Sequence, residues 1–330
     1  MKEEKVKREY DKNYKFYAPI DTQKILNKNI TKIKVMQYNE RKKQWEVKEW
    51  YYQSSEFPKN PLLIFGKLIP QTSISDEEDE NKDKYLQLVI FELNGLLTHT
   101  RVLEQLSNRI KHIMDNLQKE GFEVVSIHNL TCSWRLIIGL GASHPQETSM
   151  TLHHIYGIPY IPGSAIKGVT RHWAVLKFAE KFVGQRNEKG KFDGIIENVA
   201  KALEEGKDLN IAVDGVEFED LIKIFGTQKR QGEVIFFDAY PTENINLKID
   251  IMNPHYSKYY SGELPPADWQ SPLLVKFLTV EDTKFQFYLA AKEEDLLKKA
   301  SKLLKGALVD HGLGAKTSLG YGLFVETPHS

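Results

Sequence analysis

The chain has 330 residues, 41% hydrophobic and 27% charged, which is the composition of a folded globular protein and excludes a fibrous or disordered one. Its 45 Lys and Arg balance its 45 Asp and Glu, which excludes an overall basic surface for nucleic acid. The single cysteine, Cys132, excludes an internal disulfide framework, and we expect it to be a buried, inert thiol. The charged first residues and the absence of a run of ~18 apolar residues predict a cytoplasmic protein without a membrane span.

The first 128 residues are expected to form an N-terminal extension that packs on a core domain over residues 129–330. A charged tail is predicted over 1–24, a β-hairpin over 31–53, an acidic solvated loop over 73–84 and a strand over 85–93. Apolar residues at three- and four-residue steps then predict a helix from Val102 to Leu117, ended by Gly121. Its cationic residues, including Lys111, are interpreted as a solvated face.

The region after residue 130 is expected to be the core domain. Strands are predicted at 134–140, 233–239, 248–252, 273–278, 284–291 and 322–326, and helices at 164–182, 195–205, 217–225 and 293–309. The strands 273–278 and 284–291 are expected to pair. With one hairpin as an insertion, the order is β-α-β-β-α-β, so we predict an α+β, ferredoxin-like (RRM-like) domain with insertions. The open face of its sheet is the surface that RNA-recognition modules of this topology use.

The segment GLGAKTSLGYG, residues 312–322, is a candidate anion-binding loop between the last helix and the last strand. Its glycines are Gly312, Gly314, Gly320 and Gly322. A tight connection explains Gly312 as a helix cap but leaves the other three unexplained. Successive amides in such a turn can bind an anion, and the polar and aromatic residues that would join them are Lys316, Thr317, Ser318 and Tyr321. Neither GxxxxGK[ST] nor GxGxxG occurs in it, which excludes a nucleotide-hydrolase or dinucleotide loop.

A second candidate is the helix start PGSAIKGVTR, with Ser164 as the predicted N-cap. Lys167 and Arg171 are four residues apart and share one face, and free amides at the helix N-terminus can bind an anion. The alternative is that both cations are simply exposed to solvent. The carboxylates Asp238 and Asp250 are expected in strands, at a sheet edge or in ion pairs.

Histidine could support metal-independent RNA cleavage as a general base, and His153 and His154 are weak candidates. Because adjacent residues point in different directions, at most one of them is expected to face a substrate. No spacing of His, Cys and carboxylates resembles a zinc site, so no metal and no cofactor are expected.

Five segments together resemble the RAMP superfamily of CRISPR proteins over residues 130–326: WRLIIGLG, IYGIPYIPGSAIKGVTRH, GEVIFFDAYP, DIMNPHYSKYY and GLGAKTSLGYGLF. The elements IPGSAIKG and DIMNPHY resemble more narrowly the sixth-subunit family of the Cmr (type III-B) effector complexes. No equivalent is found here of the early-loop aspartate that the family's cleaving subunit uses.

The resemblance implies a ferredoxin-like, non-catalytic RNA-binding subunit near the 3′ end of the guide RNA, supporting target RNA binding and antiviral defence. The implied partners are guide (CRISPR) RNA, complementary single-stranded target RNA and other RAMP subunits. The implied RNA contacts are the loop around Lys316–Ser318 and the helix of Lys167 and Arg171. Two alternatives stay open: a guide-processing, metal-independent endoribonuclease, and a protein-only scaffold in which the glycines shape a subunit contact.

Overall fold

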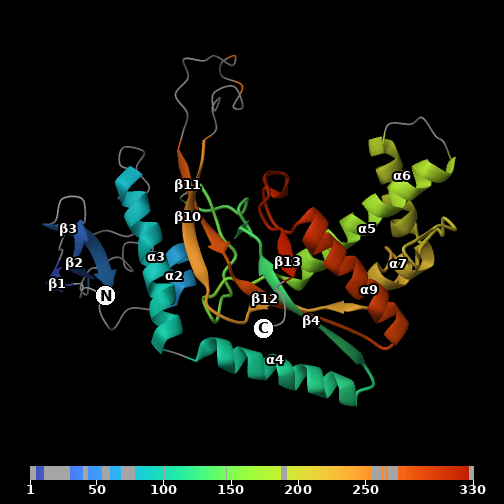
Figure 1. Ribbon diagram of the computed structural model, residues 1–330, viewed down its shortest axis with the longest axis horizontal. Helices are drawn as coiled ribbons and strands as arrows, with labels where there is room; N and C mark the ends of the chain where they lie inside the picture. Colours follow the sequence, from blue (N-terminus) through green and yellow to red (C-terminus); the bar gives the residue numbers. More distant parts are fainter. Residues whose placement is uncertain are drawn as a thin grey trace. The chain divides into compact units, whose positions relative to one another are not determined.

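The computed structural model describes residues 5–10, 30–39, 44–53, 60–67, 79–99, 101–145, 147–186, 192–253, 262, 265 and 274–326 (Figure 1). The chain divides into two compact units. Unit 1 comprises Met1–Val102, Gly139–Ile158 and Leu247–Thr279, and unit 2 comprises Leu103–Ile138, Pro159–Asn246 and Val280–Ser330. The division predicted after residue 128 falls inside a strand of unit 2, Glu123–Cys132.

Unit 1 begins with a three-stranded antiparallel sheet in the order β1-β2-β3. Its strands are β1 (Lys5–Tyr10), β2 (Ile30–Asn39) and β3 (Gln44–Gln53). β2 and β3 form a hairpin in which Ile33 lies opposite Trp50, so the hairpin predicted over 31–53 is confirmed. The part of the predicted tail that the structure describes is the strand β1.

Helices α2 (Pro61–Lys67) and α3 (Asp79–His99) follow in unit 1. The prediction of a strand over 85–93 is wrong, and so is that of an acidic loop from residue 79 onward. The acidic run continues into the first turn of α3. Acidic residues stabilise a helix there, because they interact favourably with its positive end. The buried Tyr85, Val89 and Leu93 recur at helical spacing, and the Tyr85 hydroxyl donates to the carbonyl oxygen of Phe65 in α2 at 2.6 Å.

The strands β10 (Asn246–Met252) and β11 (Val275–Glu281) lie where strands were predicted over 248–252 and 273–278, and they are neighbours in a second sheet. Thr279 Oγ1 donates to the carbonyl oxygen of Lys248 at 3.2 Å. The predicted pairing of 273–278 with 284–291 is wrong, because the two segments belong to different sheets. Between them Asp282 has φ 44°, a tight turn that lets the chain leave one sheet for the other.

The main sheet of unit 2 has the order β13-β4-β12-β8, and each neighbouring pair is antiparallel. Its strands are β4 (Glu123–Cys132), β8 (Ile235–Phe236), β12 (Lys284–Ala291) and β13 (Phe324–Glu326), with β9 (Tyr240–Pro241) also paired to β12. Phe285 lies opposite Leu130 and Phe324 opposite Cys132. The chain is therefore a mixed α/β protein with antiparallel sheets, which is the broad class expected.

β4 is a long strand of the main sheet that was not predicted from the sequence. The first strand of the core was predicted at 134–140, but only β5 (Arg135–Leu136) is a strand there, paired with the last two residues of β11. Ile137 and Ile138 are buried, so the apolar run marks the core rather than a long strand. β4 contains polar residues, among them Ser126 and His128. Its alternation of apolar and polar residues is therefore too weak to predict a strand.

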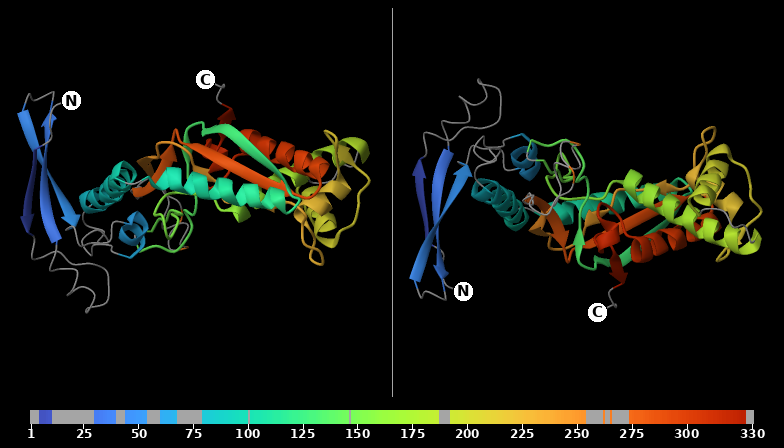
Figure 2. Two further views of the ribbon diagram at one scale, coloured as in Figure 1. Left: turned by 90° about the horizontal axis from the view of Figure 1, so that it is seen from below. Right: turned by 90° about the horizontal axis from the view of Figure 1, so that it is seen from above.

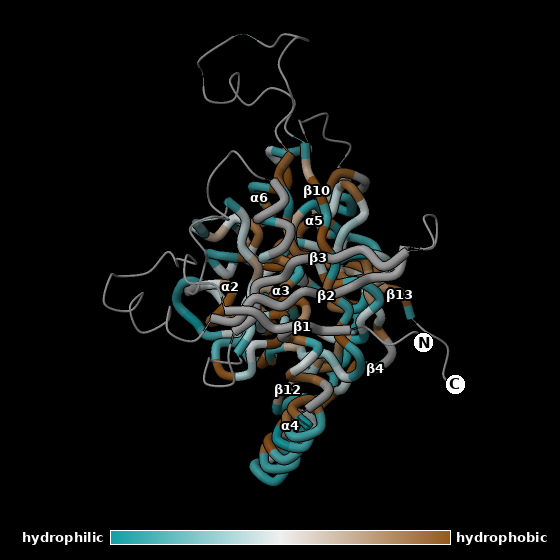
Figure 3. Tube along the Cα trace, turned by 90° about the vertical axis from the view of Figure 1, so that its left-hand side faces the viewer, coloured by the Kyte–Doolittle hydropathy of each residue, from teal (hydrophilic) through white to brown (hydrophobic). Residues whose placement is uncertain are grey.

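Helices flank this sheet on both sides (Figures 1 and 2). α5 (Gly163–Arg186) and α9 (Glu294–Gly306) lie on one face, and α4 (Val102–Lys119) runs along the other. Most of α4 is hydrophilic (Figure 3), while its Leu106 and Met114 are buried. The three predicted helices are confirmed, but the expectation of an open sheet face is wrong, because α4 runs along it.

Buried aromatic rings form much of the core between the sheet and its helices: Phe178, Phe218, Phe285, Phe287 and Phe324. Burying one such side chain stabilises a fold by about 1.5–3 kcal/mol. Within the described ranges, no helix is long and apolar enough to cross a membrane, and no group of three or more metal-ligating side chains is found. Cys132 is buried, and burial raises the pKa of its thiol to about 12, which confirms the expected inert cysteine.

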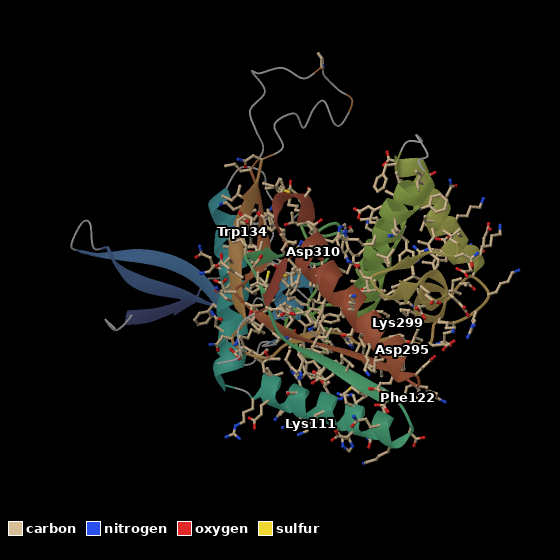
Figure 4. All side chains as sticks on the ribbon, turned by 45° about the vertical axis from the view of Figure 1, so that its right-hand side comes forward. Lys111, Phe122, Trp134, Asp295, Lys299 and Asp310 are labelled. Carbon is tan, nitrogen blue, oxygen red and sulfur yellow. The ribbon has the colours of Figure 1, made fainter. Side chains whose placement is uncertain are left out.

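The remaining elements of unit 2 are α6 (Phe192–Glu205), α7 (Phe218–Phe225) and the hairpin of β6 (Ala212–Val213) and β7 (Val216–Glu217). Both predicted short helices are thus confirmed. Lys299 of α9 bridges Asp220 of α7 at 2.9 Å and Asp295 of its own helix at 2.8 Å (Figure 4). Hydrogen bonds to Asp295 and Asp220 raise the pKa of Lys299, so it stays charged and joins the two helices.

Candidate nucleic-acid interface

The glycine-rich loop, residues 312–322, follows the π-helical turn η2 (Ala307–His311) and leads into β13. Backbone hydrogen bonds close its base and fasten it beside β5: Leu313 N–H to Gly322 O at 2.9 Å, Gly322 N–H to Arg135 O at 2.7 Å and Ala315 N–H to Ile137 O at 2.9 Å. The position of the loop between the last helix and the last strand is as predicted. Both of its ends are therefore held by the fold.

All four glycines of the loop have positive φ, between 69° and 98°. Gly314 and Gly322 also lie so close to the carbonyl oxygens of Ile137 and Leu313 that any Cβ would collide with backbone. Gly312 ends the π-helical turn. Each glycine thus has a conformational reason. The expectation that a tight connection leaves three of the glycines unexplained is wrong, and the number of glycines is no evidence for an anion.

The tip of the loop carries the polar residues expected to bind phosphate. Lys316 adopts the left-handed conformation (φ 60°) and precedes a short 3-10 turn, η3 (Thr317–Leu319). Ser318 is exposed, while Lys316 and Thr317 are half-buried. The amides that donate within the protein are those of Gly312, Leu313, Ala315, Leu319, Gly320 and Gly322. The side-chain groups that an anion at this tip would meet are the Lys316 ammonium and the two hydroxyls of Thr317 and Ser318.

Two aromatic rings lie at the end of the loop. Tyr321 is buried, and its ring centroid is 4.7 Å from that of Trp134, which is 44% exposed. The Lys316 Nζ atom lies 6.0 Å from the Tyr321 ring centroid, and the Arg135 guanidinium carbon lies 5.4 Å from that of Trp134. Trp134 and Arg135 were not predicted as site residues. Their only sequence signal is a tryptophan and an arginine in adjacent positions before an apolar run.

A pair of histidines lies beside the start of the loop, and the sequence analysis missed it. The His311 ring is 5.1 Å from that of His172 and 6.0 Å from that of Trp173, both on α5. Burial lowers the pKa of His311, and the neighbouring His172 lowers it further, which favours the neutral imidazole. π-helical turns such as η2 are frequent at functional sites.

The N-terminus of α5 is already occupied by a carboxylate. The helix begins at Gly163, whose N–H donates to Asp238 Oδ1 at 2.7 Å. The prediction of Ser164 as N-cap is wrong, because Ser164 is an exposed residue of the first turn. Asp238 lies in the bend between β8 and β9, not in a strand. The chain's own Asp238 therefore fills the expected anion site, and an RNA contact of Ser164 stays a prediction.

Lys167 and Arg171 are half-buried, so neither is fully exposed. Arg171 Nη2 donates to Glu204 Oε1 at 3.0 Å and to the carbonyl oxygen of Ala200 at 3.4 Å, which joins α5 to α6. Desolvation lowers the pKa of Lys167. The next residue, His172, instead contacts the turn before the glycine-rich loop. Arg171 and that loop therefore lie on different sides of α5, and RNA contacts of Lys167 and Arg171 stay predictions.

His153 and His154 lie in a turn of unit 1. Their rings stack at 5.0 Å with 15° between the planes, so the expectation that they point apart is wrong. His153 Nδ1 accepts the N–H groups of Ile155 and Tyr156 at 3.2 and 3.3 Å. Because these bonds use its lone pair, His153 has a structural task in the turn, and a role as general base stays a prediction.

The chain matches the model of the RAMP superfamily over residues 130–325. It is 44% identical to the CRISPR system Cmr subunit Cmr6 of Pyrococcus furiosus, over 81% of this chain and 94% of that protein. It is 26% identical to the CMR subunit Cmr6 of Saccharolobus solfataricus, over 80% of this chain and 79% of that protein.

Among solved structures, a chain of the Type III-B Cmr-beta bound to cognate target RNA shares 25% identity, covers 83% of this chain and 82% of itself, and gives a TM-score of 0.49. The assignment of the chain to a family rests on the sequence matches, since the family model spans more than half of the chain. The chain therefore belongs to the RAMP superfamily of CRISPR proteins and is a homologue of the Cmr6 subunits.

Proposed function

We propose that this chain is a non-catalytic, RNA-binding structural subunit of a type III-B CRISPR effector complex, placed near the 3′ end of the guide RNA. Its partners are guide RNA, complementary single-stranded target RNA and other RAMP subunits, and its role is to support target RNA binding in antiviral defence. The 44% identity to Cmr6 supports this assignment. The type III-B complex with a chain similar to this one is bound to cognate target RNA, which supports the choice of ligand.

We assign unit 2 to the ferredoxin-like arrangement. Its sheet order β13-β4-β12-β8 supports this, because the strands follow the chain order β4, β8, β12, β13 with α5 after the first and α9 after the third. That sequence of elements is β-α-β-β-α-β. The hairpin β6-β7, α6 and α7 are then insertions between α5 and β8.

The observation that carries the RNA-binding proposal is the tip of the glycine-rich loop. Lys316 and two hydroxyl side chains follow one another on a loop whose base is fixed by backbone hydrogen bonds. A fixed lysine with neighbouring hydroxyls is suited to a phosphodiester. A locally placed charge of this kind also reconciles RNA binding with a net charge of zero.

The test compares Lys316→Ala with Lys111→Ala, which removes an exposed lysine from α4 (Figure 4). Binding of a single-stranded oligoribonucleotide is measured over a salt series. Lys316→Ala should weaken binding and reduce the slope of log affinity against log salt by about 0.7, as expected for one lost phosphate contact to a single strand. Lys111→Ala should leave both unchanged. Equal effects of the two variants would contradict the proposal.

A second candidate function is metal-independent RNA cleavage, and the pair of His172 and His311 beside the loop favours it. The lowered pKa of His311 suits a base that takes a proton from a 2′-hydroxyl, and the His172 ring lies 5.1 Å away. Incubation of the chain with CRISPR repeat RNA in EDTA decides between the two candidates. Under our proposal the RNA stays intact. A product that disappears in His311→Ala would replace our proposal with the endoribonuclease.

A further inference from the structure

The backbone on both sides of Trp134 is fastened to the end of the glycine-rich loop. The Ser133 N–H donates to the carbonyl oxygen of Leu323 at 2.8 Å, and the carbonyl oxygen of Arg135 accepts the N–H of Gly322 at 2.7 Å. The backbone at Trp134, which lies two residues after the end of β4 (Figure 4), is therefore held against the loop. Its position relative to the loop is fixed before any ligand arrives.

The Trp134 ring packs against the Tyr321 ring, with 43° between the two ring planes, and cationic side chains lie near both rings. Tyr321 is only 6% exposed, so it forms a firm base for a Trp134 ring that is 44% exposed. Arg135 lies over the Trp134 ring and is held by an ion pair with Glu281, in which Nε and Oε1 are 3.3 Å apart. Lys316 lies near the Tyr321 ring. Two tilted aromatic rings thus lie in contact, each with one cationic side chain nearby.

A half-exposed aromatic ring beside a lysine is the combination with which proteins bind single-stranded nucleic acid. The ring stacks on a base, while the cations contact the backbone. We propose that Trp134, supported by Tyr321, stacks on an unpaired base of the RNA whose backbone contacts Lys316. This inference rests on the proposed function and adds a base contact to its phosphate contact.

The proposal makes the ligand a single strand and makes the contact tolerant of base identity. Every base has a π face, whereas a base within a duplex is already stacked on its neighbours. Arg135 is paired with Glu281, so its guanidinium supports the ring rather than adding a free charge. Removal of Trp134 should therefore change affinity without changing the salt slope.

The experiment uses the full chain and two probes of equal length, oligouridylate and an abasic ribose-phosphate oligomer. Trp134→Ala should weaken oligouridylate binding about tenfold, within the range for loss of one stacked base, and leave abasic binding unchanged. Trp134→Phe should retain most of the affinity but lose the quenching of tryptophan fluorescence by bound oligouridylate. Lys316→Ala should weaken both probes equally. Trp134→Leu keeps apolar bulk against Tyr321 and replaces Trp134→Ala if that variant does not fold.

Equal binding of oligouridylate by wild type and by Trp134→Ala or Trp134→Leu overturns base stacking. The same loss with both probes also overturns it, because the ring would then act through the backbone or the fold. Loss of co-purifying protein subunits with unchanged RNA affinity would assign Trp134 to a protein contact instead. If wild type binds neither probe, the proposed function itself fails, whereas the outcomes above contradict only the stacking contact.

Discussion

The N–H of Gly163 donates to Asp238 Oδ1 at 2.7 Å, so the first turn of α5 is capped by a carboxylate from the bend after β8. The Tyr240 hydroxyl donates to the other carboxylate oxygen at 3.4 Å. Asp238 thus interacts favourably with the positive end of the helix dipole. A phosphate at this helix end would meet a negative charge. We therefore expect the RNA contacts at the glycine-rich loop instead.

Asp238→Ala should destabilise the chain by about 1 kcal/mol, as expected for loss of a helix cap. Asp238→Asn should lose less stability, because it keeps a hydrogen-bond acceptor and removes only the charge. Urea unfolding followed by circular dichroism measures both. Glu197→Ala, at an exposed position of α6, is the matched control and should have little effect. An Asp238→Ala variant as stable as this control would show that the cap contributes nothing.

Gly322→Ala should be far more damaging than Gly320→Ala. At Gly322 a Cβ meets the carbonyl oxygen of Leu313, whereas at Gly320 it meets nothing within 4 Å. Both positions have positive φ, which costs an alanine about 1 kcal/mol, and the collision adds roughly 1–3 kcal/mol at Gly322. Thermal unfolding gives the difference. Similar losses for the two variants would mean that the base of the loop is less tightly packed than described.

A fall in pH should destabilise the π-helical turn η2, which leads into the glycine-rich loop. Because the pKa of His311 is lowered in the folded state, the unfolded chain binds the additional proton more readily. The contribution of His311 to the stability of the folded state is complete above pH 6.5 and is lost as the pH falls below that value. His172→Ala should raise the pKa of His311, since it removes the electrostatic effect of the neighbouring imidazole. The His311 ring proton followed by NMR over pH 4.5–8 measures the shift.

His112→Ala, on the exposed surface of α4, is the control for this titration and should leave the His311 curve unchanged. A His311 pKa that is the same in wild type and His172→Ala would contradict the contact between the two rings. The stability of His172→Ala should also fall less steeply below pH 6.5 than that of wild type.

The sequence predicted the helices of unit 2 well, because α4, α6, α7 and α9 each have a clear apolar stripe. It failed at α3, where an acidic run resembles a loop until the burial of Tyr85 and Val89 is known. It failed again at β4, whose polar Ser126 hydrogen-bonds Gln286 on the neighbouring strand. Such a partner is distant in the chain and has no local signal.

The candidate site was predicted only in part. The loop and its position follow from its glycines, but the contacts that define it come from elsewhere in the chain. Trp134 meets Tyr321, His172 meets His311 and Asp238 meets Gly163 only after folding. Local spacing relates residues within one helix or strand, so it placed Lys167 beside Arg171 but could not show that Glu204 pairs with Arg171.

The hydrogen bond from Leu313 to Gly322 divides the glycine-rich loop into two parts with different freedom to vary. Residues at its base must keep their glycines, since the neighbouring carbonyl groups leave no room for a side chain. Ser318 and Leu319 at its tip are exposed, Leu319 by 66%, and are under no such constraint from packing. Substitutions at the exposed tip should therefore leave the base of the loop, and the fold that holds it, unchanged.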